Sequence, residues 1–174
     1  MGSLSLEIKA RCPDPSKVRA ILKSRRARFK GLDRQIDTYF CVSSGRLKLR
    51  EGHIENVLIY YQRTNQKNSK RCDSVLYESR DASTLKKILT TSLGVLVTVN
   101  KDREIYFIRN AKFHIDRVKR LGSFVEIEVF ERKGMRDPAL LKKQCRDFQE
   151  LLGIRPGDLV PDSYSDMILR SGKR

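Results

Sequence analysis

The chain has few of the residues that build several common kinds of site. Its 174 residues include no Trp, only two His and four Cys, and aromatic residues make up 7%. The cysteines are widely spaced and no two form a C-x-x-C pair, so neither a zinc motif nor a redox motif is indicated. Two histidines cannot form a multi-histidine zinc site, and neither a P-loop nor a G-x-S-x-G motif occurs.

Long hydrophobic runs are also missing. No apolar segment approaches the ~20 residues that a membrane-spanning helix needs, and the chain begins directly with strand-like alternation. We therefore expect a cytoplasmic protein with free thiols and no membrane partner. A length of 174 residues is enough to bury a sizeable core, so we expect residues 1–174 to form a single domain.

Carboxylates are scarce relative to cations. Lys and Arg number 37 against 21 Asp and Glu, which gives a formal charge of +16. Such an excess predicts an anionic partner, which can be nucleic acid, anionic lipid or a phosphorylated small molecule. Charge alone does not choose among these three.

The spacing of apolar residues predicts many strands and a few helices. Strands are expected at 4–11, 35–42, 46–50, 57–63, 74–79, 95–99, 104–109, 112–118 and 124–131, with a loop at 65–71 and a hairpin turn at 100–103. Helices are expected after the caps at 13–16 and 81–83, from Pro138 to Gly153, and at 164–169. The first of these helices should end before Gly31. Because the connections are short, the predicted fold is α+β, mainly antiparallel β.

Charged residues recur at every second position in several predicted strands, which places each set on one face. The sets are Glu7, Lys9 and Arg11; Arg46, Lys48 and Arg50; Lys112, His114 and Asp116; and Glu126 with Glu128. One interpretation is an ordinary sheet whose charged face lies in water. Recurrence across strands favours another, in which the apolar faces pack outward against helices and the charged faces line a closed or nearly closed barrel.

Crowded cations inside a barrel predict an anionic ligand. Two cations ~7 Å apart repel by roughly 2 kcal/mol at an effective dielectric constant near 20. Polyphosphate oxygens can accept hydrogen bonds from several Lys and Arg side chains together. Divalent ions such as Mg²⁺ prefer carboxylate and phosphate oxygens, so Glu7, Glu126 and Glu128 are candidate metal ligands. For Glu126 and Glu128 the alternative is charge balance with neighbouring Arg.

The opening residues 5–9, Ser-Leu-Glu-Ile-Lys, resemble the ExExK signature of the CYTH superfamily, the triphosphate tunnel metalloenzymes. Segments 35–40, 45–52, 109 with 112–118, 121–129 and 163–166 are similar to its class IV adenylyl cyclase branch, so the resemblance spans nearly the whole chain. It implies a closed eight-stranded tunnel with flanking helices, open at both ends. It also implies a triphosphate bound by basic residues and one or two Mg²⁺ or Mn²⁺ ions bound by glutamates.

Carried over by position, the resemblance implies metal binding by Glu7, Glu126 and Glu128, with Asp116 as a further candidate. It implies that phosphate is bound by Lys9, Lys48, Arg50, Arg63 and Arg109, to which the face assignment adds Arg11 and Lys112. Ser5 stands where the signature has its first Glu. This departure removes one carboxylate from the expected metal site.

Two classes of function follow. The first is a metal-dependent enzyme, either a cyclase that converts ATP to cyclic AMP and pyrophosphate or a triphosphatase that hydrolyses tripolyphosphate or thiamine triphosphate. The second is a non-catalytic binder of polyphosphate or nucleic acid, which the charge of +16 and Ser5 favour. The lack of an RNA-recognition signature and of Trp argues against this binder. No residue pattern identifies a catalytic base, so the catalytic residues stay unassigned.

Overall fold

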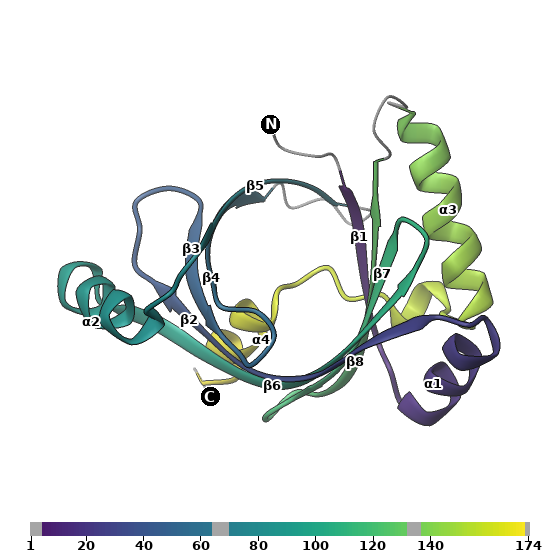
Figure 1. Cartoon of the computed structure of the whole chain (residues 1–174), viewed down its shortest axis with the longest axis horizontal. Coiled ribbons are helices and arrows are strands. Elements are labelled where there is room, and N and C mark those ends of the chain that lie inside the picture. The colour runs from purple at the N-terminus through teal and green to yellow at the C-terminus, as the bar shows by residue number, and fades with distance from the viewer. Residues whose placement is uncertain (1–4, 64–69, 132–136, 173–174) are drawn as a thin grey trace.

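The computed structural model describes residues 5–63, 70–131 and 137–172, and of residues 63 and 70–73 only the backbone. Eight strands close into a ring in the order β1–β5–β4–β3–β2–β6–β7–β8, and all neighbouring pairs are antiparallel (Figure 1). The strands are β1 (Ser5–Arg11), β2 (Arg28–Phe40), β3 (Arg46–Glu51), β4 (Val57–Arg63), β5 (Lys70–Glu78), β6 (Val95–Ile108), β7 (Ala111–Val118) and β8 (Gly122–Phe130). This confirms the predicted mainly antiparallel, closed eight-stranded barrel.

Four α-helices flank the barrel: α1 (Pro15–Ser24), α2 (Ala82–Leu93), α3 (Pro138–Leu151) and α4 (Tyr164–Ser171), and a short 3-10 helix spans Pro156–Asp158. Each α-helix begins after a side chain that accepts hydrogen bonds from the free N–H groups of the first turn: Asp14, Asp81, Asp137 and Ser163. These four caps explain why the first residues of the helices could be predicted from the sequence. None of the described helices is long and apolar enough to cross a membrane.

The main core lies between the outer face of the barrel and helices α1 and α3. Outward-facing apolar residues of β1, β7 and β8 pack there against Leu22 of α1 and Leu141 of α3; they include Leu6, Ala10, Phe113, Ile115, Val125, Ile127 and Val129. Because side chains alternate along a strand, burying this set outward turns the charged set inward. The predicted orientation of the charged rows is therefore confirmed for these three strands.

Helix α4 packs against the barrel near one end. Its residues Tyr164, Met167 and Ile168 pack among inward-facing apolar side chains near that end, which include Tyr39, Ile59, Tyr61, Val97, Val99 and Phe124. Arg46 of β3 donates to both carboxylate oxygens of Asp166, at 2.8 and 2.9 Å, and so fixes the helix to the barrel wall. The expectation that both ends are open stays a prediction.

Three expected boundaries differ from the structure. Residues 100–103 are not a hairpin turn, because β6 runs without a break from Val95 to Ile108 and pairs along its length with β2. Their polar side chains fit a strand, since Lys101 and Arg103 lie buried in the tunnel while Asn100 and Asp102 lie outside. Helix α1 ends at Ser24, before Gly31 as expected, but β2 spans Arg28–Phe40 and so begins seven residues before the predicted strand 35–42. Of the expected loop 65–71, residues 65–69 lie outside the described part and Lys70 and Arg71 belong to β5.

Candidate functional site

The inner wall of the barrel carries the charged rows, and Asp37 of β2 is the centre of one cluster. Its carboxylate accepts from Lys48 at 3.1 Å, from Arg50 at 2.8 and 3.0 Å, and from Lys101 at 2.7 Å. Burial opposes ionisation of Asp37, but the charges of Arg50, Lys101 and Lys48 hold its pKa well below its usual range. Burial lowers the pKa of Lys101 to about 7 in spite of the Asp37 charge.

A second cluster has Arg103 of β6 at its centre. Its guanidinium donates to both oxygens of Asp116, at 2.7 and 2.5 Å, and to Glu126 at 2.6 Å. Lys9 lies 3.2 Å from the other oxygen of Glu126, and its ammonium lies 4.1 Å from the ring centroid of Tyr164. Burial opposes ionisation of Glu126, but Arg103 and Lys9 keep its pKa well below its usual range. The cluster is therefore held as charged pairs.

A loop between β3 and β4 adds a carboxylate that joins these rows. Asp33 is fully buried and accepts from the backbone N–H groups of His53, Ile54 and Glu55 at 2.6–3.2 Å, which fixes the loop. The loop thereby places Glu55 between Arg50 and Lys112, each 2.8 Å away. Burial raises the pKa of Glu55, but Arg50 and Lys112 outweigh it and lower the pKa well below the usual range.

Glu7 and Glu128 face each other on β1 and β8 at the end of the barrel opposite α4. In contrast to the carboxylates above, neither has an ion-pair partner in the described part of the chain. Burial, together with the Glu7 charge, raises the pKa of Glu128 to about 7, and Ser5 donates to Glu128 at 3.0 Å. Two facing carboxylates that form no ion pair with a described residue suit a divalent ion, because Mg²⁺ is commonly held by one or two carboxylates plus substrate phosphates. Among the described residues no set of three or more ligands gathers into a metal centre.

The described tunnel cations are paired within the protein, where six of them share four carboxylates. Each described one has a carboxylate partner within 3.2 Å: Lys9, Lys48, Arg50, Lys101, Arg103 and Lys112. The sequence alone predicts cations that repel one another and therefore need an anionic ligand. The structure differs because it places carboxylates from β2, β7, β8 and the β3–β4 loop among them, so a ligand must compete with internal partners.

The remaining predicted site residues lie at several places. Asp116 is fully buried, and besides Arg103 it accepts from the Tyr164 hydroxyl at 2.7 Å. Arg11 is exposed at the end of β1, and Arg109 is exposed in the turn between β6 and β7. The side chain of Arg63 is outside the described residues. The structure thus brings Lys9, Lys48, Arg50 and Lys112 together with the glutamates, while the roles of all of them stay predictions.

His114 carries a buried ring nitrogen, Nε2, whose hydrogen-bonding capacity is not satisfied by the described residues. Its Nδ1 lies 3.2 Å from Glu126, and Nε2 has no hydrogen-bond partner among the described residues. Burial, with the nearby Arg103 charge, lowers the pKa of His114 to about 4, so the ring is neutral near pH 7. With an ionised Glu126 as acceptor, Nδ1 carries the proton and Nε2 is an acceptor. Such a buried acceptor requires a donor, which a water or a ligand hydroxyl would supply.

Sequence reasoning missed five charged or polar members of these clusters: Asp33, Asp37, Glu55, Lys101 and Arg103. The alternation of Asp33, Gln35 and Asp37 could have indicated a polar inner face of β2, since all three are buried on one face of that strand. Lys101 and Arg103 were hidden by their assignment to a turn. Glu55 had no local signal, because a loop brings it to Lys112, which is 57 positions away.

Comparison with known proteins identifies the family. The CYTH domain model matches residues 4–164, and the chain therefore belongs to the CYTH domain family. No curated protein sequence matches the chain.

Solved structures agree with this family. A protein from Pyrococcus horikoshii OT3 is 25% identical, with a TM-score of 0.82 over 93% of this chain and 98% of its own. A candidate adenylate cyclase from Vibrio parahaemolyticus is 15% identical, with a TM-score of 0.79 over 97% of this chain and 99% of its own. A candidate adenylyl cyclase from Hippeastrum, described as having a dominant triphosphatase activity, is 15% identical, with a TM-score of 0.66 over 97% of this chain and 96% of its own. Together these findings confirm the predicted family and tunnel fold.

Proposed function

We propose that the protein is a divalent-metal-dependent enzyme that acts on a triphosphate inside the tunnel. The observation that carries the proposal is the asymmetry of the inner wall. Every described cation there has a carboxylate partner, whereas Glu7 and Glu128 face each other with no ion pair to a described residue. Membership of the CYTH family supports this reading, as do the cyclase and triphosphatase descriptions of the similar structures.

The paired cations supply the phosphate site. A triphosphate carries several oxygens that accept hydrogen bonds, so it can replace the carboxylates of Asp37 and Glu55 as partners of Lys48, Arg50 and Lys112. Arg50 is held from two sides by Asp37 and Glu55, which keeps its guanidinium in place before the ligand arrives. Such preorganised donors stabilise negative charge that develops as a P–O bond breaks.

The metal site consists of Glu7 and Glu128, with Ser5 orienting one oxygen of Glu128. A bound Mg²⁺ or Mn²⁺ would polarise phosphate oxygens of the substrate. We do not include Glu126 and Asp116 as ligands in this proposal. Their oxygens are bound by Arg103, Lys9 and Tyr164, and releasing Asp116 would leave Arg103 partly unpaired in a buried position. Ser5 in place of a Glu therefore leaves two carboxylates, which matches one metal ion rather than two.

The attacking group is positioned by His114. Its neutral ring holds an accepting Nε2 inside the tunnel, which can orient a water or a ribose hydroxyl by accepting its hydrogen bond. Water as nucleophile gives phosphate release, and a ribose hydroxyl attacking the α-phosphorus of ATP gives cyclic AMP and pyrophosphate. Both reactions use the same cationic wall and differ in which atom lies next to His114.

Product analysis tests the proposal. The protein is incubated with ATP, tripolyphosphate or thiamine triphosphate, with Mg²⁺, Mn²⁺ or EDTA, and phosphate, pyrophosphate and cyclic AMP are quantified. We expect turnover that requires metal, and the product identifies the reaction. An absence of turnover with all three substrates and both metals would reject the enzymatic assignment.

Two Glu→Gln variants distinguish loss of the proposed metal ligand from loss of any one carboxylate charge. Glu128→Gln keeps the shape of the side chain but removes the charge, and we expect it to lower kcat by at least about 100-fold, on the scale of one lost group that stabilises transition-state charge. Glu150→Gln is the matched control, because Glu150 is exposed on α3 outside the barrel. Equal activity of the two variants would place the metal elsewhere.

A further inference from the structure

The internal pairing of the tunnel raises the question of where the excess positive charge lies. The described tunnel cations are matched by carboxylates, yet the chain has a formal charge of +16. Among the described residues, unpaired positive charge therefore lies mainly outside the tunnel. An outward charge of this size attracts a polyanion independently of any ligand held in the tunnel.

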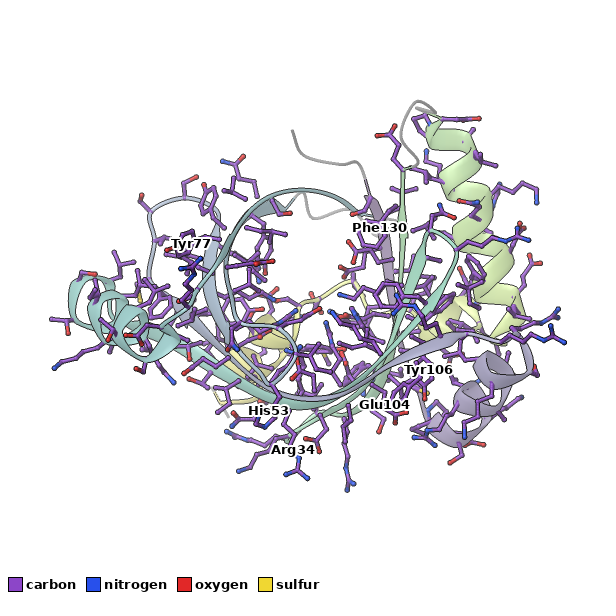
Figure 2. All side chains as sticks on the ribbon, in the orientation of Figure 1. Arg34, His53, Tyr77, Glu104, Tyr106 and Phe130 are labelled. Atoms are coloured by element: carbon purple, nitrogen blue, oxygen red, sulfur yellow. The ribbon has the colours of Figure 1, made fainter. Side chains whose placement is uncertain are left out.

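Part of this charge gathers in a groove on the outer side of the barrel wall. The groove has a volume of about 1180 Å³. Its floor is formed by β2 and β6 and includes the buried Gln35 and Lys101 beside residues exposed on the outer face. One side is the β7–β8 turn, and the other is the β3–β4 loop with the start of α2. Arg34 lies on this outer side, beyond the ribbon that separates it from the tunnel (Figure 2). We call this hollow the outer groove.

Four exposed cations line the outer groove: Arg34, Arg117, Lys119 and Arg120. In the part of the chain that the structure describes, none of them has an ion-pair partner. Asp102 lies between Arg34 and Arg117 in the strand register and offsets one charge, while Glu51 is already bound to Lys86 at 2.7 Å. The groove therefore keeps a net positive charge, in contrast to the tunnel.

We propose that the outer groove binds a single strand of nucleic acid through its phosphates. A hollow of this size exceeds the usual range for a pocket that encloses one small molecule, and it is open, so it fits a segment of a chain. A phosphate every few ångströms along a strand can engage cations from three separate segments at once. Asn100, exposed on the floor, adds an amide that can donate to and accept from bases or sugars.

Shape and composition decide between this partner and an anionic membrane. Binding at a lipid surface requires protruding apolar side chains that enter the bilayer beside the cations. Here the cations surround a concave surface, and the apolar residues that line it are Ile36, 40% exposed, Ala82 and the buried Val118. Among the described residues that line the groove there is no Phe, Tyr or Trp, and the exposed His53 is the one ring available for stacking, so binding should depend mainly on charge.

The test is fluorescence anisotropy with a labelled, mixed-sequence single-stranded RNA over a range of salt concentrations. The groove variant carries Arg34→Gln, Arg117→Gln, Lys119→Gln and Arg120→Gln. We expect it to lose at least about tenfold in affinity at low salt. The slope of log K against log salt should fall by about 3, since each lost phosphate contact on a single strand contributes roughly 0.7.

A matched variant removes four exposed cations from α1 and α3 instead: Lys17→Gln, Lys23→Gln, Lys142→Gln and Arg146→Gln. It has the same net charge as the groove variant, so we expect it to lose less than about threefold in affinity. Equal losses in the two variants would show diffuse attraction and overturn the proposal. Retained RNA binding by the groove variant, with lost binding to phosphatidylserine vesicles, would identify a membrane surface instead.

The groove variant should keep its activity and its melting-temperature increase with tripolyphosphate, because its four substituted residues lie outside the tunnel. This readout separates the outer groove from the proposed enzyme site. If the groove variant has a markedly lower melting temperature than the wild type, the double variant Arg34→Gln/Arg117→Gln is used in its place. Its slope of log K against log salt should change by about half as much as expected for the groove variant. An unchanged slope in a folded variant of either kind would refute the proposal.

Discussion

Replacing Asp37 with Asn removes the charge that holds three tunnel cations together. The three, Lys48, Arg50 and Lys101, all donate to this one buried carboxylate. Breaking a buried ion pair by removing one partner costs about 3–5 kcal/mol, because the other charge is left without compensation. We expect the lower end of this range, about 3 kcal/mol, since Lys101, whose pKa is already about 7, can lose its proton. For a chain of this length that corresponds to a decrease in Tm of about 10 °C.

The same substitution should strengthen the response to a polyanion. We expect tripolyphosphate to compete with Asp37 for Lys48 and Arg50 in the wild type, whereas in Asp37→Asn Lys48 loses this carboxylate and Arg50 keeps only Glu55. We therefore expect tripolyphosphate to raise the Tm of the variant by more than it raises that of the wild type, as measured by differential scanning fluorimetry. A ligand at a hundredfold excess over its Kd stabilises the folded state by about 2.7 kcal/mol, so the increase is measurable.

The control for this prediction is Asp147→Asn. Asp147 lies on the exposed surface of α3, where it pairs with Lys143, and its loss should change stability by less than about 0.5 kcal/mol. Two results would refute the reasoning about Asp37. One is a decrease in stability no larger than that of the control. The other is a tripolyphosphate response in Asp37→Asn that is equal to or smaller than the wild-type response.

Three further predictions concern other parts of the tunnel. The pKa of Glu128 is raised from 4.5 to about 7, so the folded state binds more protons than the unfolded state in this window and loses stability as pH rises through it. Without metal, the free energy of unfolding of Glu128→Gln, measured with urea, should rise relative to that of the wild type by up to about 3 kcal/mol between pH 4.5 and about pH 8. A difference between the two proteins that does not change with pH would contradict this. Tyr164→Phe removes the hydrogen bond to Asp116 and should cost about 2 kcal/mol in chemical denaturation, against no change for the exposed Tyr77→Phe. Gly52→Ala would place a Cβ 2.6 Å from the Asp33 carboxylate and should destabilise by about 1–3 kcal/mol, whereas Gly157→Ala, with nothing within 4 Å, should not; similar Tm values for the two would disprove the close contact.

Period-two alternation, together with the resemblance to the CYTH superfamily, predicted the barrel and the direction in which its charged faces point. Glu7 and Lys9 share a face with each other, as do Glu126 and Glu128, and the covering of the opposite faces by α1 and α3 turns these faces inward. Helix starts were predictable because an Asp or Ser that accepts from the first turn has a local sequence pattern.

Pairing between distant segments was not predictable in the same way. The partner of Lys112 is Glu55, the partner of Arg46 is Asp166, and both contacts depend on how a loop or a terminal helix meets the barrel. Polar residues in the middle of a strand were a second obstacle. Asn100 and Asp102 favour turns by composition, and only pairing with β2 on one side and β7 on the other makes them part of a strand.

Helix α4 makes the two ends of the barrel chemically different. Tyr164, Met167 and Ile168 pack near Phe124 at one end, while Glu7 and Glu128 lie toward the other end. A ligand that carries a divalent cation would therefore be oriented along the tunnel, with its metal toward the end that holds the two carboxylates.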